Sequence, residues 1–504
     1  MSACPTTPGR GLVPLFRSAR SAVAFSVACG LLTSASSAQA ESSTATTAVT
    51  AAELAGVTRL SAKTSTGAGS GMRTEKRAVP NLDRRPEEGA DAGDVLLWVP
   101  RALLSPLHLV FEWGLRRPIG SLLTVAERDK WADVIVDFLT FEDRKIGVIP
   151  TVFYDFNFRP SVGLYVFWNE LGHPAHSMRL VGGFGGLDWY RATLADRWDL
   201  GGGSQLDFSI NYWGRPDYIY AGEGAGAEND PCGGACPDNR SRYFEEYYEG
   251  KGSLLVNAWR GSEIRLELGV RHSRFDNGAA ESDERSIEAA VAGADPYFDA
   301  LPTGYSTGLF SNYQRLLLRL DTRQARPEPG SGFLLELQGS HGWDMERPGE
   351  RQWVGYGAEA GAFWDLGQWR VLGLSAMVQL ADPLKGKSIP FTELVVLGRK
   401  PGEMEAFLPG TLRGRSAAIA TLEYRYPIWI FLDGTFHASV GNVFDERFEG
   451  FQVQKMRSSF GLGVRSTQDP DNELTILFAL GTSRFDEPFS VDSFRLVAGT
   501  QTGF

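Results

Sequence analysis

The segment Ile264-Arg-Leu-Glu-Leu-Gly-Val-Arg271 decides the fold, because apolar residues alternate through it with charged or small ones. Successive side chains of a β-strand point to opposite faces, so this segment predicts a strand with one apolar face. The same alternation recurs in Gln205-Leu-Asp-Phe-Ser-Ile-Asn-Tyr212, from Leu316 to Arg323, and in Leu422-Glu-Tyr-Arg-Tyr426. Residues 144–504 are therefore predicted to be all-β and antiparallel.

The number of alternating segments predicts about sixteen strands. Their expected starts are residues 146, 160, 176, 187, 204, 243, 262, 311, 332, 352, 368, 416, 432, 455, 472 and 491. An average of about 22 residues for each strand with its connection is ordinary for an outer-membrane barrel. Three connections are long, at 214–242, 274–310 and 383–415, and an even strand count places all three at the extracellular end.

Alternation alone fits two kinds of protein. In a soluble β-sandwich the apolar faces meet in a core, whereas in an outer-membrane barrel they meet lipid and the polar faces line the lumen. Aromatic residues near the ends of the expected strands favour the transmembrane barrel, because such residues gather at the membrane–water interfaces. These aromatic residues are Trp213, Trp259, Trp364, Trp369 and Trp429.

The amino-terminal residues predict an export signal. Several arginines precede an apolar stretch at 22–32 and the small-x-small segment Ala38-Gln-Ala40. This order is typical of a secretory signal peptide, and the apolar stretch is shorter than a membrane-spanning helix. We therefore expect residues 1–40 to be removed, so that the exported chain begins at Glu41 and reaches the bacterial outer membrane.

The carboxy-terminal residues predict a final strand that ends at Phe504. Alternate positions from Phe494 onward are apolar or Thr, as expected for a strand with one face toward lipid. A last strand with an aromatic terminus resembles the sorting signal of outer-membrane barrels. Gly499 and Gly503 stand on its other face, and glycine weakens a strand. We therefore expect a weak seam between the first and last strands.

Composition argues against several function classes. The net charge of −11 argues against nucleic acid as the main partner. We recognise no Ser/His/Asp arrangement, paired-carboxylate site or nucleotide-binding loop in the sequence, and the six histidines are scattered. We therefore expect a protein that is not an enzyme and that needs no metal ion or cofactor.

A cysteine pair stands in the connection at 214–242. Cys232 and Cys236 lie in Asp230-Pro-Cys-Gly-Gly-Ala-Cys-Pro-Asp238. A structural zinc ion needs four ligands, and this short pair has no histidine or further cysteine beside it. An oxidising compartment favours a disulfide, so we expect the two residues to form one that staples an extracellular loop.

The region between the leader and the barrel has two parts. Residues 41–93 are rich in Ser, Thr, Ala and Gly and lack apolar periodicity, which predicts a disordered linker. Residues 94–143 are more apolar and predict a helical segment, in which Thr124-Val-Ala-Glu127 supplies a capping box. This segment fits a membrane-surface helix, a helix that plugs the barrel, or a small cap under the barrel.

Four segments of the barrel region have a characteristic order and spacing. They are Tyr220-Ala-Gly-Glu-Gly224, Leu320-Asp-Thr-Arg323 with Pro329-Gly-Ser-Gly-Phe333, Leu412-Arg-Gly-Arg415, and Leu422-Glu-Tyr-Arg-Tyr-Pro427. Together they resemble motifs of the BamA/TamA superfamily, the bacterial surface-antigen barrels that insert or secrete proteins at the outer membrane. The resemblance covers roughly residues 146 to 504.

The chain departs from the pattern of that superfamily at three points. Arg415 replaces the aromatic residue that usually follows Arg-Gly, and Ser439 stands where an aspartate is usual. Between 41 and 145 no substrate-receiving POTRA domain is recognisable, and the region is too short for two of them. A general assembly factor with its own substrate-receiving domains is therefore not expected.

The resemblance implies roles for two groups of residues. Arg413 is implied to hold a loop folded back into the lumen by binding a carboxylate, and Glu423 or Glu473 would replace the missing aspartate. The alternative for Arg413 is a solvated loop arginine. The residues Asp321, Thr322 and Arg323 mark a turn between two middle strands, and Asp321 fits an ion cluster in the lumen.

Three functions follow from these expectations. In the first, the barrel assists insertion or translocation of unfolded outer-membrane or secreted client proteins. In the second, it is a passive pore or structural barrel that has lost its substrate-receiving domains. In the third, it is an outer-membrane phospholipase, which would need a Ser/His pair that the sequence does not reveal. The lipid bilayer is the expected partner in each case.

Overall fold

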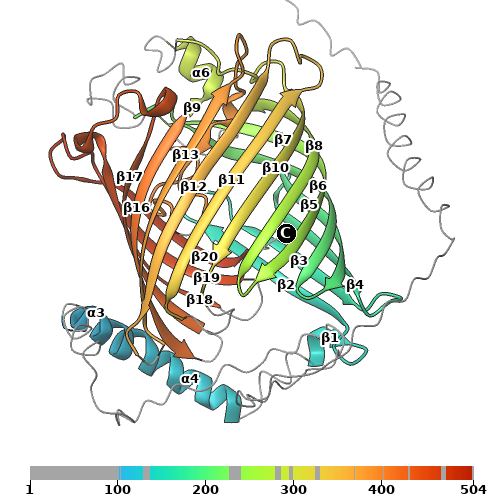
Figure 1. Cartoon of the computed structure of the whole chain (residues 1–504), viewed down its shortest axis with the longest axis vertical. Coiled ribbons are helices and arrows are strands. Elements are labelled where there is room, and N and C mark those ends of the chain that lie inside the picture. Colours follow the sequence, from blue (N-terminus) through green and yellow to red (C-terminus); the bar gives the residue numbers. More distant parts are fainter. Residues whose placement is uncertain are drawn as a thin grey trace, which may run out of the picture. The chain divides into compact units, whose positions relative to one another are not determined.

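The computed structural model describes a β-barrel and the helices beside it (Figure 1). The described residues are 102, 104–128, 137–225, 240–278, 285–293, 299–323, 330–367, 369–400, 402–429, 432–466 and 473–501. All of them belong to one compact unit, Gly67–Phe504. The expected leader and linker, the pair Cys232 and Cys236, and the terminal residues Gly503 and Phe504 lie outside the described residues.

Sixteen antiparallel strands close into a barrel, because the last strand pairs back with the first. They are β2 (Ile146–Asp155), β3 (Ser161–Asn169), β4 (His176–Gly186), β5 (Trp189–Gly201), β6 (Ser204–Tyr220), β7 (Ser241–Trp259), β8 (Ser262–Asn277), β10 (Leu309–Asp321), β11 (Gly332–Asp344), β12 (Gln352–Asp365), β13 (Val371–Pro383), β16 (Ser416–Trp429), β17 (Leu432–Phe444), β18 (Arg457–Ser466), β19 (Glu473–Thr482) and β20 (Val491–Gln501). Each begins within three residues of its expected start. The prediction of a sixteen-stranded antiparallel barrel is confirmed.

The outward-facing residues of the strands form an apolar belt. Leu316, Leu318 and Leu320 of β10 are 40–48% exposed, and Leu335 and Leu337 of the neighbouring β11 are exposed to a similar degree. A soluble sandwich would bury these side chains, since apolar surface left in water is unfavourable by roughly 25 cal/mol per Å². The belt therefore identifies the protein as a transmembrane barrel of the outer-membrane type.

The long connections lie at one end of the barrel, because consecutive strands run in opposite directions. They are residues 221–240, 278–308 and 384–415. In outer-membrane barrels the longer loops are extracellular and the shorter turns periplasmic. The start of β2 and the end of β20 are therefore at the periplasmic end. The second long connection also contains β9 (Arg285–Ser286), which pairs with β7, and the short helix α6 (Ile287–Ala292).

A helical segment precedes the barrel, as expected. It consists of α3 (Ser105–Leu109), the π-helix η1 (Val110–Arg116) and α4 (Arg117–Arg128), with helical backbone angles at the two junctions. The expected capping box at Thr124 is wrong, because Thr124 lies inside α4 and its hydroxyl donates to the Gly120 carbonyl (2.7 Å). Within the described residues, none of the helices combines the length and the apolar character that a membrane-crossing helix needs.

Candidate functional site at the barrel seam

The connection 384–415 folds back into the lumen and forms an apolar plug. It contains the turn η2 (Phe391–Glu393) and a small hairpin of β14 (Val395–Val396) with β15 (Arg413–Gly414). The plug residues Phe391, Leu397, Met404 and Phe407 are at most 2% exposed and pack against inward-facing residues of the wall. The reversal at Gly398 needs glycine, because φ is +84° and a Cβ atom would lie 2.2 Å from the Phe407 carbonyl oxygen.

Hydroxyl groups of the wall fasten the tip of this plug. The Thr421 and Ser439 hydroxyls both donate to the Gly402 carbonyl, at 2.8 Å and 3.1 Å. The Ser459 hydroxyl accepts from the Ala406 amide at 3.0 Å. Ser439 therefore binds the backbone of the loop through a neutral hydrogen bond.

Arg413 is buried in the plug, with 1% of its surface exposed. Its guanidinium donates to the Phe391 carbonyl and lies near the rings of Tyr220 and Phe391, 5.5 Å and 5.2 Å from their centroids. Such cation–π contacts are stronger when desolvated. The backbone carbonyl of Arg413 also accepts from the Gly224 amide at 2.8 Å. A solvated loop arginine is therefore not what the structure contains.

Two motifs that are far apart in the sequence meet at Arg413. Tyr220 and Gly224, which delimit the segment Tyr220-Ala-Gly-Glu-Gly224, both contact it. The same segment also contains Glu223, which interacts electrostatically with Arg413. Burial raises the pKa of the Glu223 carboxyl, and the positive charge of the Arg413 guanidinium opposes this shift. The expected partner Glu423 instead forms a two-pronged ion pair with Arg425, at 2.7 Å and 3.0 Å.

The remaining predicted residues occupy separate places. Glu473 begins β19, with its backbone opposite Gln501, and its side chain is outside the described part. Asp321 binds the guanidinium and the amide of Arg323 at the periplasmic turn between β10 and β11. The hydroxyl of Thr322 accepts from the Phe333 amide across that turn. Asp321, Thr322 and Arg323 therefore stabilise a turn, and they are distant in the chain from the plug.

The seam between β2 and β20 is short. Phe153, Tyr154 and Asp155 of β2 pair with Gly499, Ala498 and Val497 of β20. The next shortest junction of the barrel, between β18 and β19, has seven paired residues in each strand. On the same edge of β2, no described residue is paired with Val148–Val152.

Two residues stand near the place where the described pairing ends. The Phe156 amide donates to Leu496 of β20, so the even-numbered amides of β2 point to the seam. Pro150 is one of these positions and has no N–H to donate. At Gly499 the strands approach so closely that a Cβ atom would lie 2.4 Å from the Val152 carbonyl oxygen. Glycine at position 499 permits this close contact, and that it weakens the seam stays a prediction.

A buried arginine bridges the seam to the plug. Arg495 of β20 binds both carboxylate oxygens of Asp155 in β2, at 2.9 Å and 2.8 Å. Its remaining Nη1 donates to the carbonyls of Gly398 and Glu405 in the plug, at 2.9 Å and 3.2 Å. Arg495 and Asp155 are 7% and 4% exposed. One side chain therefore joins the first strand, the last strand and the loop.

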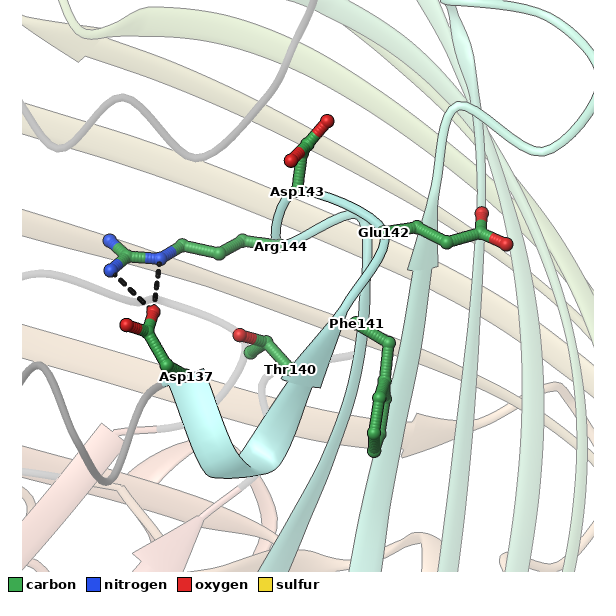
Figure 2. Close-up of a pocket in the computed structure, with 6 residues that line it drawn as sticks. All are labelled: Asp137, Thr140, Phe141, Glu142, Asp143 and Arg144. Carbon is green, nitrogen blue, oxygen red and sulfur yellow. Dashed lines mark hydrogen bonds and ion pairs between the residues drawn. The ribbon is translucent and has the colours of Figure 1, made fainter.

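A two-residue strand covers the periplasmic end of the same edge. β1 (Thr140–Phe141) pairs with Gly147 and Ile146 of β2. The turn that follows has three consecutive non-glycine residues with left-handed φ: Glu142 (+49°), Asp143 (+54°) and Arg144 (+68°). Figure 2 shows Arg144 reaching across the open hollow of this turn to Asp137, an ion pair of 2.8 Å. Left-handed residues cost about 1–2 kcal/mol each, so this cover is strained.

The bridge between Arg495 and Asp155 was not among the residues singled out from the sequence. The two residues are 340 positions apart, and each looks like one more charge on an alternating strand. The sequence does contain a sign of this bridge. The first strand carries the negative Asp155 and the last strand the positive Arg495, both on inward faces in the extracellular halves of the strands. Among the described residues, no group of three or more His, Cys, Asp or Glu side chains is arranged to hold a metal ion.

No protein-family model matches this chain, and no curated protein sequence matches it either. Solved structures with a similar fold include BamA from Haemophilus ducreyi lacking POTRA domains 1-3, at 15% identity and a TM-score of 0.48, over 71% of this chain and 70% of that chain. CdiB from Acinetobacter baumannii is 11% identical, with a TM-score of 0.42 over 71% of this chain and 60% of that one. CdiB from Escherichia coli is 12% identical, with a TM-score of 0.43 over 70% and 62%. By its strand pairing and its apolar belt, the chain is an outer-membrane β-barrel of sixteen strands.

Proposed function

We propose that this protein is a non-catalytic barrel that assists the insertion or translocation of unfolded client proteins through its seam. The observation that carries the proposal is the short pairing of β2 with β20, which comprises three residues in each strand among those that the structure describes. Each backbone hydrogen bond contributes about 0.5–1.5 kcal/mol, so a junction with few of them opens at lower cost than the rest of the wall.

The unpaired edge of β2 supports the same proposal. An exposed strand edge is a template on which an extended segment of another chain adds as a further strand. Among the described residues, none pairs with this edge over Val148–Val152, between β1 and the paired part of β20. Because Pro150 offers no N–H there, a client strand is held by fewer hydrogen bonds than a barrel strand and is released more easily.

The plug favours a route through the wall over a route through the lumen. Phe391, Leu397, Met404 and Phe407 close the extracellular part of the lumen with apolar side chains. A passive pore would need a continuous polar channel along the barrel axis. A structural barrel that moves no client is the competing proposal, and it differs in that its seam never has to open.

A reversible cross-link across the seam tests the proposal. Tyr154 and Ala498 are direct partners, and hydrogen-bonded antiparallel partners have Cα atoms about 5.5 Å apart, within reach of a disulfide. The variant Tyr154→Cys/Ala498→Cys is folded into liposomes, and the folding of an added outer-membrane client barrel is followed with the disulfide intact and after reduction. The matched control, Leu337→Cys/Ala358→Cys, cross-links β11 to β12, where the wall is already long-paired.

The proposal expects the seam disulfide to abolish any acceleration of client folding and reduction to restore it. The control disulfide should leave the acceleration unchanged in both states. If clients fold no faster with the reduced seam variant or the wild type than in empty liposomes, the competing proposal of a structural barrel is favoured. If acceleration persists with the seam cross-linked, the seam is not the route.

A further inference from the structure

One face of the helical segment α3–η1–α4 is docked on the barrel. Phe111 of η1 is fully buried and stacks on Tyr426 of β16, with ring centroids 5.6 Å apart. Phe111 also occupies the space beside Gly434 of β17, where a Cβ atom would lie 2.5 Å from its ring. The partly buried residues that pack around the same cluster include Leu107, Leu115 and Ile119. The segment is thus a packed part of the barrel.

The docking surface is the outside of the barrel wall. On β16, Thr421 contacts the plug and Glu423 lies on the same inward face, since side chains alternate along a strand. Leu422, Tyr424 and Tyr426 therefore point outward, and Leu422 is 37% exposed in the apolar belt. A helix that plugs the lumen, one of the three arrangements expected from the sequence, is not what the structure contains.

A small polar network fixes the helix on this surface. The Tyr426 hydroxyl donates to the Glu112 carboxylate, which also pairs with Arg116 at 2.9 Å and with Arg117 at 3.8 Å. Glu112 therefore balances the charge of Arg116, while Arg117 lies at the edge of the network and is more exposed. The close pair of Glu112 and Arg116 lets the helix lie beside apolar surface without an unpaired charge on its buried side.

The face of the helix that points away from the barrel is apolar. Leu109, Val110 and Trp113 are 55%, 49% and 59% exposed. The Arg117 guanidinium lies 3.4 Å above the Trp113 ring, the pairing of a basic group with tryptophan that suits a membrane–water interface. If this face met water, three large apolar side chains would stand together in solvent, which soluble surfaces avoid.

The exposed face of the helix continues the lipid-facing belt of the barrel. Leu372 of β13 and Leu462 of β18 pack against the helix cluster. Two residues further along each strand, on the same outward face, stand Leu374 and Phe460, which are 50% and 45% exposed in the belt. Helix and belt therefore border each other at the periplasmic end, where Figure 1 shows α3 and α4.

From this continuity we infer that the segment Ser105–Arg128 lies in the surface of the periplasmic leaflet, between the barrel wall and phospholipid. Leu109, Val110 and Trp113 insert among the acyl chains, while Phe111 keeps the helix on the wall. Amphipathic helices of this kind lie about 5–10 Å deep, at the boundary of headgroups and acyl chains. Glu112 offsets one of the two positive charges of Arg116 and Arg117, so apolar contact is the main attraction to lipid and the remaining charge of Arg117 lies beside the Trp113 ring.

A fluorescent label at position 113 tests the inference. The four cysteines of the chain are replaced by serine, and Trp113→Cys is labelled with an environment-sensitive fluorophore and folded into phosphatidylcholine liposomes. Quenching is measured with spin-labelled lipids and with aqueous iodide. Leu374→Cys in the belt is the lipid control, and Asp143→Cys in the β1–β2 turn is the water control at the same end of the barrel. Altered mobility on unheated gels confirms that each variant is a closed barrel.

The inference expects the label at 113 to behave like the label at 374. Its quenching by lipid should lie within about a factor of two of the belt label, with weak iodide quenching, as for a probe at the acyl-chain boundary. Iodide quenching equal to that of the label at 143 would overturn the inference. Protection from both quenchers would also overturn it, because a second copy or another protein would then cover the helix. Leu109→Cys repeats the measurement without removing the contact between Trp113 and Arg117.

Discussion

Between β7 and β8, sixteen residues of each strand are paired, whereas between β2 and β20 the described pairing comprises three. The wall at β7–β8 depends on a long backbone ladder, and its side chains add to it. At the seam the side chains contribute more than the backbone ladder, because a buried ion pair and a hydrogen bond to the plug join the two strands. A junction held by side chains can be changed by a single substitution, whereas a ladder of this length resists one.

Removal of Arg495 should have the largest effect on this difference. Arg495→Ala leaves Asp155 buried without its partner, and breaking a buried pair in this way costs about 3–5 kcal/mol. We expect faster amide exchange along β2 and at the plug tip. Hydrogen exchange followed by mass spectrometry measures this in detergent-folded protein.

The control for Arg495 is Arg271→Ala, which removes the partner of Glu245 in the wall between β7 and β8. It should lower the overall stability toward urea without a selective increase in exchange of β2. Equal exchange of β2 in both variants would mean that Arg495 has no special place at the seam.

Arg413 should rank second, because it holds the plug without touching the seam. Arg413→Ala removes a hydrogen bond to Phe391 and two ring contacts, and desolvated cation–π contacts contribute about 2 kcal/mol each. We expect faster tryptic cleavage after Arg399, with strand content unchanged by circular dichroism. Arg413→Lys should restore the charge but only part of the protection, because lysine lacks the planar group that lies against the rings. Cleavage unchanged in the alanine variant would show that the plug is held without Arg413.

A methyl group at Gly499 should have a smaller effect. Gly499→Ala places a Cβ atom 2.4 Å from the Val152 carbonyl oxygen, and overpacking of this kind costs about 1–3 kcal/mol. The seam should separate locally, which a lower urea midpoint and faster exchange at Tyr154 would reveal. Gly250→Ala is the matched control, because Gly250 stands in β7 with no atom within 4 Å of the added Cβ. The comparison between seam and wall fails if both alanines have the same effect.

Relief of the strained turn beside β1 should have the smallest effect, and in the opposite direction. Asp143→Gly accommodates the left-handed φ of +54° and should stabilise the turn by up to about 1 kcal/mol. We expect slower exchange at Ile146, and slower client folding if the edge of β2 is the client site. Arg260→Gly, at another left-handed position in the turn between β7 and β8, should change neither quantity. Faster exchange in Asp143→Gly would mean that β1 does not close the edge.

The strands could be predicted from the sequence, because alternation reports directly which residues face lipid. Segments such as Ile264–Arg271 give the strand and its outward face, and the starts follow within three residues. The plug was also predictable, from the glycines and Arg413 in a long connection. The wrong capping box shows the limit for helices: Thr124 and Glu127 have the spacing of a capping box, yet that spacing also occurs inside a helix. The helix begins at Ser105, and Pro106 stands in its first turn, where a helix tolerates proline.

The partners of charged residues could not be predicted. Glu423 seemed a candidate for Arg413, but Arg425 stands two residues away on the same inward face and binds it. Asp155 and Arg495 meet only because the barrel closes, and closure is a property of all sixteen strands together. The face of the helix that docks on the barrel was equally hidden, since both Phe111 and Trp113 are aromatic, and only the fold decides which of them is covered.

The shared arginine makes the loop and the seam thermodynamically linked. Two nitrogens of the Arg495 guanidinium bind Asp155, and the third binds the backbone of the plug. Displacement of the plug therefore removes a contact that orients the ion pair. Opening of the seam, in turn, removes a contact that holds the plug. Linkage between two sites is reciprocal: whatever free energy seam opening costs the loop, loop displacement costs the seam. Lys385 and Gly386 of this connection are exposed at the extracellular end. If the seam opens as proposed, a molecule that binds there from outside the cell and prefers one position of the plug shifts the population of open barrels by at most this coupling free energy.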